Sequence, residues 1–300
     1  MTKKIPVGQT ISAAYNFAFT RFFSVLGVVW FPYLVFAAIV AGLVFLAVPD
    51  LPRMFATHEF DIGELTGLSR VVPLIGIIGF IASCMIAVGV QRTALGRETG
   101  PRWFYFSLGP AVWRMAAAFF LAGLVVVFIA CVIAGICAAI WFAAANLSAG
   151  VWAIRVIAIL AGICFIVYIV TRLLFFLPAV VIAEETIGIE RAWILSRGNF
   201  WRIFLVWLAI VVPVLIASWM VSHALLRPFM FWPRAHMDMR ELVRMLVMQF
   251  GAFAPIFLVI QFVERLVLLG VGNGAIASAY RAVAGSAAPT PAPGVQAGSP

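Results

Sequence analysis

The sequence predicts an all-α protein that crosses a membrane six times and carries short amphipathic helices at the membrane surface. Hydrophobic residues make up 65% of the 300 residues and charged residues only 10%, more apolar surface than a water-soluble chain of this size can bury. The mean hydropathy of +1.14 has the same implication. Six apolar runs, separated by short Arg-rich segments, are each long enough for the ~20 residues that a helix needs to cross the hydrocarbon core.

The apolar runs place the expected spans in order along the chain, at residues 22–48, 71–91, 115–143, 151–183, 203–226 and 246–270. The third and fourth are divided at residues 146–150, whose Asn-Leu-Ser-Ala-Gly sequence is typical of a turn. The first run exceeds the apolar core of a signal peptide, so we expect it to remain in the protein. The spans occupy most of residues 1–285, and no separate soluble domain is expected.

Three segments that precede spans are expected to lie in the headgroup layer as amphipathic helices. Val7–Thr20 and residues 187–197 place apolar side chains at helical spacing, and Gly198 provides a stop for the second of these helices. The third segment, residues 103–108, is shorter and aromatic. The chain thus divides into three units of one surface helix and two spans. This pattern fits either an internal repeat or the periodicity of any protein built from membrane hairpins.

The basic residues predict the orientation of the chain in the membrane, and the composition of the last residues predicts a tail. Thirteen Lys and Arg lie in the segments on the side of the N-terminus and seven in the segments on the other side, so both termini are expected in the cytoplasm. The net charge of +9 is spread over span ends, which favours binding to anionic headgroups over binding to nucleic acid. Residues 286–300 contain no charge and are rich in Ala, Pro, Gly and Ser, so a disordered tail is expected.

Ionisable residues inside spans are the candidate functional or structural positions, because they are costly in lipid. Arg172 lies in the fourth span, and Gln261, Glu264 and Arg265 form a polar stripe at i, i+3 and i+4 on the sixth. Arg172 and Glu264 are expected at similar depth, and we predict that they face each other and interact. Such a pair fits a lipid or ion pathway or a structural link between two helices. In a third interpretation Arg172 only extends to the inner surface.

No catalytic, cofactor or metal site is predicted. The sequence lacks G-x-S-x-G, P-loop and H-E-x-x-H motifs. The glycine-rich residues 270–274 follow a span and are expected to end or kink the last helix. The His and Met residues of 223–245, and His58 with Glu59 and Asp61, lack the repeated spacing of metal ligands. The four cysteines lie inside spans and are expected to pack as small apolar residues.

Residues 171–204, TRLLFFLPAVVIAEETIGIERAWILSRGNFWRIF, resemble the glycerophosphoryl diester phosphodiesterase membrane-domain family of bacterial and archaeal integral membrane proteins. The segments VGQTISAAYNFAFTRFF and GAIASAYRAV fit the same family. By this resemblance the family-motif residues are Arg172, Pro178, Glu184 or Glu185, Ala192, Ser196, Phe200-Trp201 and Tyr280. The resemblance implies a six-span body in the bacterial cytoplasmic (inner) membrane. The soluble phosphodiesterase barrel that gives the family its name is absent, so the resemblance implies architecture and not activity.

The sequence therefore predicts a non-catalytic membrane scaffold or lipid-associated partner protein. Its expected partners are membrane lipids, and another membrane protein or a second copy of the chain. The alternative is a small-molecule or lipid transporter or channel with a polar centre near Arg172 and Glu264. An enzyme acting on lipid phosphodiesters is the third reading. A hydrated cavity around Arg172 would favour transport, and a dry, packed interior would favour the scaffold.

Overall fold

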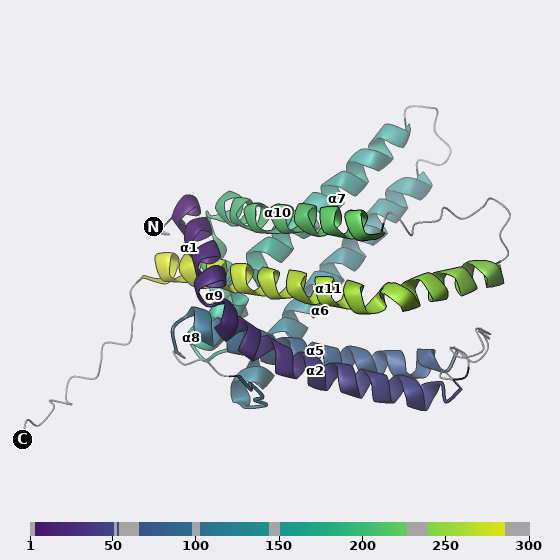
Figure 1. Cartoon of the computed structure of the whole chain (residues 1–300). Coiled ribbons are helices and arrows are strands. Elements are labelled where there is room, and N and C mark those ends of the chain that lie inside the picture. The colour runs from purple at the N-terminus through teal and green to yellow at the C-terminus, as the bar shows by residue number, and fades with distance from the viewer. Residues whose placement is uncertain are drawn as a thin grey trace, which may run out of the picture.

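The computed structural model describes residues 4–50, 53, 66–97, 103–143, 151–226 and 239–285. In chain order its helices are α1 Val7–Thr20, α2 Phe22–Ala47, α5 Leu68–Ala94, α6 Pro110–Ala143, α7 Val151–Leu174, α8 Leu177–Ala183, α9 Ile189–Ser196, α10 Phe200–Leu226 and α11 Met239–Ala284 (Figure 1). Six of these, α2, α5, α6, α7, α10 and α11, are long and apolar enough to cross a membrane. The described residues contain no strand. The predicted all-α fold class is confirmed, and the chain is a multi-pass membrane protein.

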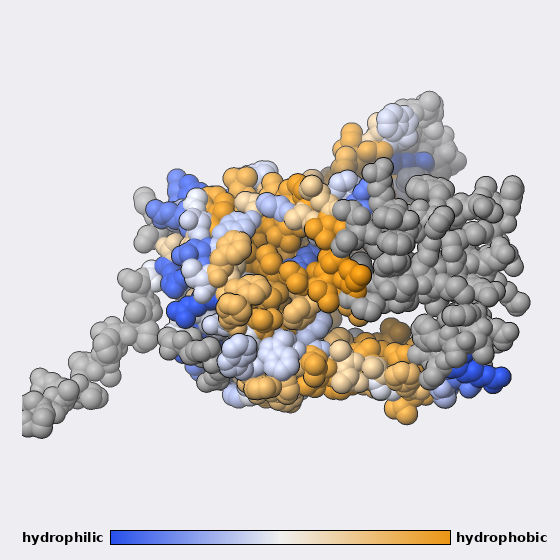
Figure 2. Space-filling model, in the orientation of Figure 1, coloured by the Kyte–Doolittle hydropathy of each residue, from blue (hydrophilic) through white to orange (hydrophobic). Residues whose placement is uncertain are grey.

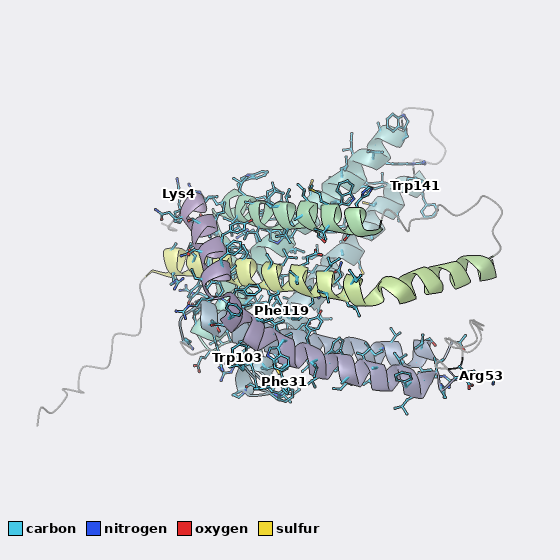
Figure 3. All side chains as sticks on the ribbon, viewed as in Figure 1. Lys4, Phe31, Arg53, Trp103, Phe119 and Trp141 are labelled. Atoms are coloured by element: carbon cyan, nitrogen blue, oxygen red, sulfur yellow. The ribbon has the colours of Figure 1, made fainter. Side chains whose placement is uncertain are left out.

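The long helices share one end of the molecule, where α1, α8, α9 and the last turns of α11 also lie (Figure 1). We call this end the base. Three hairpins extend from it, in which α2 packs on α5, α6 on α7, and α10 on α11. Lys4 lies in the base, and Trp141 lies at the far end of α6 (Figure 3). The base is therefore where all the elements meet.

Buried side chains are concentrated in the base. Every long helix contributes to this core, for example through Val29, Val88, Met115, Leu173, Ile203 and Val271. The remaining parts of the long helices, which we call the distal halves, are residues 33–47, 68–83, 123–143, 152–168, 211–223 and 256–265. Gly162 is the one buried residue among the described side chains of these segments. The space-filling view shows the apolar surface that α10 and α11 expose beyond the base (Figure 2).

The helices α2, α5, α6 and α10 agree with the expected spans to within five residues at each end. The expected fourth span agrees with the candidate membrane span Trp152–Ala183, but its helix is interrupted, because α7 ends at Leu174 and α8 begins at Leu177. Pro178 lies in the first turn of α8. In a continuous helix its ring would clash with the carbonyl of Leu174 and its missing N–H would leave that carbonyl unpaired, so the helix breaks here.

The expectation that residues 270–274 end or kink the last helix is wrong as far as the helix end is concerned, because α11 continues to Ala284. These glycines instead allow α11 to approach α1. A Cβ built at Gly270 would lie 3.3 Å from the Cβ of Ala18, and one built at Gly274 would lie 3.2 Å from the carbonyl oxygen of Ala14. Small residues one turn apart on both helices thus let the two backbones come close together.

Two of the three expected surface helices form. The first is α1, and the second is α9, which is followed by Gly198 at a φ of +75°. Both bury one face in the base. Residues 103–108 are not helical, so that expectation is wrong. Six residues are too few for a stable isolated helix. The segment is instead held from α2, where the Trp30 indole N–H donates to the Trp103 carbonyl at 2.6 Å.

Several expectations fall outside the described residues. These are the turn at 146–150, the tail at 286–300, the acidic segment around His58 and the His-Met segment around residue 236.

Candidate functional site

The most buried charged side chain of the base is Arg172, near the end of α7, which is only 8% exposed. Its Nη1 donates to the hydroxyl of Tyr168 at 2.7 Å, its Nη2 to the carbonyl of Trp193 at 3.1 Å and its Nε to Oγ of Ser196 at 3.3 Å. The guanidinium carbon also lies 3.8 Å from the centroid of the Trp193 ring. A cation at the C-terminal end of α9 is favoured by the dipole of that helix, so Arg172 fixes α9 against α7.

The predicted contact between Arg172 and Glu264 is wrong. Glu264 lies on α11 and its Oε2 accepts a hydrogen bond of 2.6 Å from Oγ of Ser218 on α10. The guanidinium is occupied by α7 and α9, while α10 packs against both α7 and α11. Of the predicted polar stripe, Gln261 is half-buried and Arg265 is exposed. Neither makes a hydrogen bond or ion pair within the described part of the chain, so the stripe does not act as one site.

A second polar cluster surrounds the turn that follows α8. Oε1 of Glu184 accepts hydrogen bonds from the Tyr280 hydroxyl at 3.0 Å and from Nε of Arg191 at 3.1 Å. Arg97 and Arg114 each lie 3.5 Å from the carboxylate of Glu185. These contacts join α5, α6, α9 and α11 at one turn.

The same arginines hold the backbone of this turn. Arg97 donates to the carbonyl of Ala183 at 2.8 Å, and Arg114 donates to the carbonyl of Glu185 at 2.9 Å. Glu185 has a φ of +55°, a left-handed conformation that costs a non-glycine residue about 1–3 kcal/mol unless its surroundings enforce it. Arg114 binds both the carbonyl and the carboxylate of Glu185 and so provides that enforcement.

The N-terminal segment is tied to the start of α10. The backbone N–H of Ile5 donates to Oδ1 of Asn199 at 3.1 Å, and Arg202 donates to the carbonyl of Ile5 at 2.9 Å. Ile5 is 1% exposed, so its backbone groups need these partners. The segment around Ile5 is thus a packed part of the base.

The base contains the residues on which the sequence resemblance rests, and several of them are in contact. Arg172 binds Ser196, and Glu184 binds Tyr280. Pro178 starts α8, and Ala192 is fully buried in α9. The sequence analysis missed the arginine partners of Glu184 and Glu185. A search for basic residues near the ends of neighbouring spans could have found Arg97 and Arg114, which lie close to such ends, but not Arg191, which lies within α9.

A different set of basic residues in the base faces outward. Lys4, Arg21, Arg197 and Arg281 are exposed. Unlike the arginines that bind Glu184, Glu185 or backbone carbonyls, their side chains make no hydrogen bond or ion pair with any described residue. The base thus has internal cations that hold its elements together and external cations that are open to a ligand.

No group of three His, Cys, Asp or Glu side chains able to hold a metal occurs in the part of the chain that the structure describes. Comparison of the chain with protein-family models, with curated proteins and with solved structures gave no match in any of the three. A functional assignment therefore rests on the chemistry of the base and of the distal halves.

Proposed function

We propose that this integral membrane protein is a non-catalytic scaffold that binds membrane lipids, with anionic headgroups on the external cations of the base and acyl chains on the distal halves. The observation that carries the proposal is the division of the basic residues of the base. The internal arginines, of which Arg97 and Arg191 are themselves partly exposed, bind polar groups of the base, whereas the exposed side chains of Lys4, Arg21, Arg197 and Arg281 have no described partner.

Lipid phosphates suit these external cations, since a basic residue near an anionic membrane surface contributes about 1 kcal/mol of binding energy. Glu184 and Glu185, in contrast, are bound by arginines and by Tyr280. Carboxylates that accept these hydrogen bonds are better suited to a structural role than to the role of a general base. Both features favour a lipid-bound scaffold over an enzyme that acts on lipid phosphodiesters.

The same charges suggest that the base faces the cytoplasm of a bacterial cell. Ten described Lys and Arg lie in the base, against three Glu. Positive residues next to spans remain on the cytoplasmic side, so both termini would be cytoplasmic. Reporter fusions to the C-terminus and to the segment between α2 and α5 test this: cytoplasmic activity is expected from the first and external activity from the second.

The lipid proposal is tested by thermal unfolding of the full chain in nanodiscs of phosphatidylglycerol or of phosphatidylcholine. The unaltered protein should unfold at a higher temperature in the anionic lipid. The triple variant Arg21→Gln, Arg197→Gln, Arg281→Gln should lose this difference. Arg97→Gln is the matched control, because it removes an internal cation and should lower the unfolding temperature equally in both lipids.

Equal unfolding temperatures of the unaltered protein in the two lipids would contradict the proposal. Native mass spectrometry of the extracted protein identifies its partners directly, and several phospholipids per chain are expected. A second copy or another membrane protein in fixed stoichiometry, without bound phospholipid, would point to protein partners instead.

Transport is the second candidate function. The polar centre predicted for a transporter does not form, because Arg172 and Glu264 bind other partners and not each other. What still favours it is Glu264 itself, a carboxylate on the distal half of α11 whose described polar partner is one serine. Uptake of labelled solutes by proteoliposomes that contain the protein would test it.

A further inference from the structure

A groove of about 400 Å³ lies between α10 and α11, at the inner limit of their distal halves. Pro213, Ala217 and Ser218 line it from α10, and Val263, Glu264 and Val267 from α11. Its size falls within the range of small-molecule sites. Pro213, Ala217 and Val263 are exposed, so the groove opens to the surroundings of the helices, which in a membrane is the lipid.

The inner end of the groove is fixed by a contact between α10 and α1. Pro213 has no N–H, so it leaves the carbonyl of Ala209 without its usual helical donor. The hydroxyl of Tyr15, on α1, donates to this carbonyl at 3.1 Å, and Tyr15 also lines the groove. Pro213 and Tyr15 thus both line the groove, and the hydrogen bond of Tyr15 ties α1 to α10 beside it.

Glu264 gives the groove its chemistry. Its carboxylate is half-buried, and the neighbouring walls are mainly valine. Ser218 supplies one hydrogen bond at 2.6 Å, but no described basic side chain forms an ion pair with Glu264. The next residue, Arg265, is exposed and is turned by about 100° around the helix, because an α-helix has 3.6 residues per turn. A carboxylate in such surroundings favours a cation that brings its own apolar body.

We propose that this groove binds a lipophilic monocation, with its apolar part between α10 and α11 and its positive charge on the carboxylate of Glu264. Charge complementarity selects this occupant over a neutral or anionic molecule of the same size. The groove lies apart from the external cations of the base, so it is a second site, independent of the binding of anionic headgroups.

The test is equilibrium binding of tetraphenylphosphonium to the full chain in phosphatidylcholine nanodiscs. Tetraphenylborate has the same shape and the opposite charge, and is the control ligand. Saturable binding of the phosphonium, and no saturable binding of the borate, is expected. Glu264→Gln should weaken phosphonium binding at least tenfold. Glu190→Gln removes a carboxylate that lies exposed in the base, outside the groove, and should leave binding unchanged.

A second variant keeps the test informative if Glu264→Gln fails to fold. Ala217→Phe fills the groove, leaves the carboxylate in place and should also abolish binding. Absence of saturable phosphonium binding, equal binding of the two ions, or unchanged binding in a folded Glu264→Gln variant would overturn the proposal. The proposal would also be overturned if one phospholipid stayed bound and blocked phosphonium binding equally in the unaltered protein and in Glu264→Gln. That result would identify an acyl chain as the occupant of the groove.

Discussion

The base and the distal halves are formed by the same long helices, yet they are held in different ways. On α6, Met115 is fully buried in the base, whereas Phe128, less than four turns further on, is 71% exposed. The base combines a packed apolar core with hydrogen bonds from Arg97, Arg114 and Arg172. In the distal halves, side-chain contacts join the hairpin partners, as between Ile133 of α6 and Gly162 of α7, and the ring of Tyr33 on α2 also lies 5.7 Å from that of Phe262 on α11.

The difference follows from the solvent of each region. A helix satisfies its own backbone hydrogen bonds, so a distal half needs no neighbour in order to be stable in lipid. Lipid tails are as apolar as leucine, and therefore no hydrophobic driving force brings these halves together. The base contains an interruption between two helices, short helices and turns, whose backbone polar groups need partners. This comparison predicts that equivalent substitutions destabilise the base more than the distal halves.

The largest contrast is expected between two arginines. Arg172→Ala should lower the free energy of unfolding by about 3 kcal/mol or more, since hydrogen bonds to a charged group contribute about 1.5–3 kcal/mol each. Arg155, on the distal half of α7, also binds a tryptophan. Its Nη2 donates to the Trp141 carbonyl at 3.1 Å, and its guanidinium carbon lies 4.3 Å from the centroid of the Trp141 ring. Arg155→Ala should cost less than about 1 kcal/mol, as expected of exposed contacts. Unfolding in bicelles measures both, and equal losses would break the comparison.

Two glycines on α11 test how much the close packing of α11 on α1 contributes to the stability of the base. Gly274→Ala should destabilise by about 1–3 kcal/mol, because the added methyl group overlaps the backbone of α1. Gly272 has no atom within 4 Å of its built Cβ. Gly272→Ala should therefore be neutral or stabilise by up to about 1 kcal/mol, the usual gain for removing a glycine from a helix. Thermal unfolding of the two variants side by side tests this, and a stabilising Gly274→Ala would show that α1 is not in contact with α11.

Two hydroxyl groups give a smaller contrast. Tyr280→Phe removes the hydrogen bond to Glu184 and should cost about 1 kcal/mol. Ser83→Ala, in the distal half of α5, removes an exposed hydrogen bond to the carbonyl of Gly79 and should cost less than about 0.5 kcal/mol. The same unfolding assay applies, and a larger loss for Ser83→Ala than for Tyr280→Phe would count against the division into base and distal halves.

The smallest effect is expected on the outer surface of α6. Phe128→Ala should change the free energy of unfolding in a bilayer by less than about 0.5 kcal/mol, because its side chain is mostly outside protein contacts. Met115→Ala, in the base, should cost about 2–5 kcal/mol. A loss above 1 kcal/mol for Phe128→Ala would mean that a protein surface covers this helix.

The apolar runs made most of the long helices predictable. The break before α8 was missed, although Pro178 marks it, because the apolar run continues through it. The continuation of α11 was missed because glycine can serve either to end a helix or to let two helices approach. Which role Gly270 and Gly274 have depends on the position of α1, and sequence spacing alone does not contain that position.

The polar contacts of the base were harder to predict for a different reason. Pairing Arg172 with Glu264 assumed that a buried cation needs an acid at the same depth. The partners of Arg172 are instead two hydroxyls, one backbone carbonyl and an aromatic face. Every residue has a backbone carbonyl, so the sequence does not show that those of Trp193 and Ala183 accept hydrogen bonds from arginines. Whether a carbonyl is free to accept depends on where each helix ends.

Photo-crosslinking on α6 tests most directly whether lipid surrounds the distal halves. A benzoylphenylalanine at Phe128, Ala134 or Ile136 samples three directions around this helix, and all three positions are exposed. Ile133, whose side chain meets Gly162 of α7, is the control. In native membranes the first three should form lipid adducts, and Ile133 should crosslink to α7. Crosslinks from Ala134 or Ile136 to α2, α5, α10, α11 or a second copy of the chain would contradict the account.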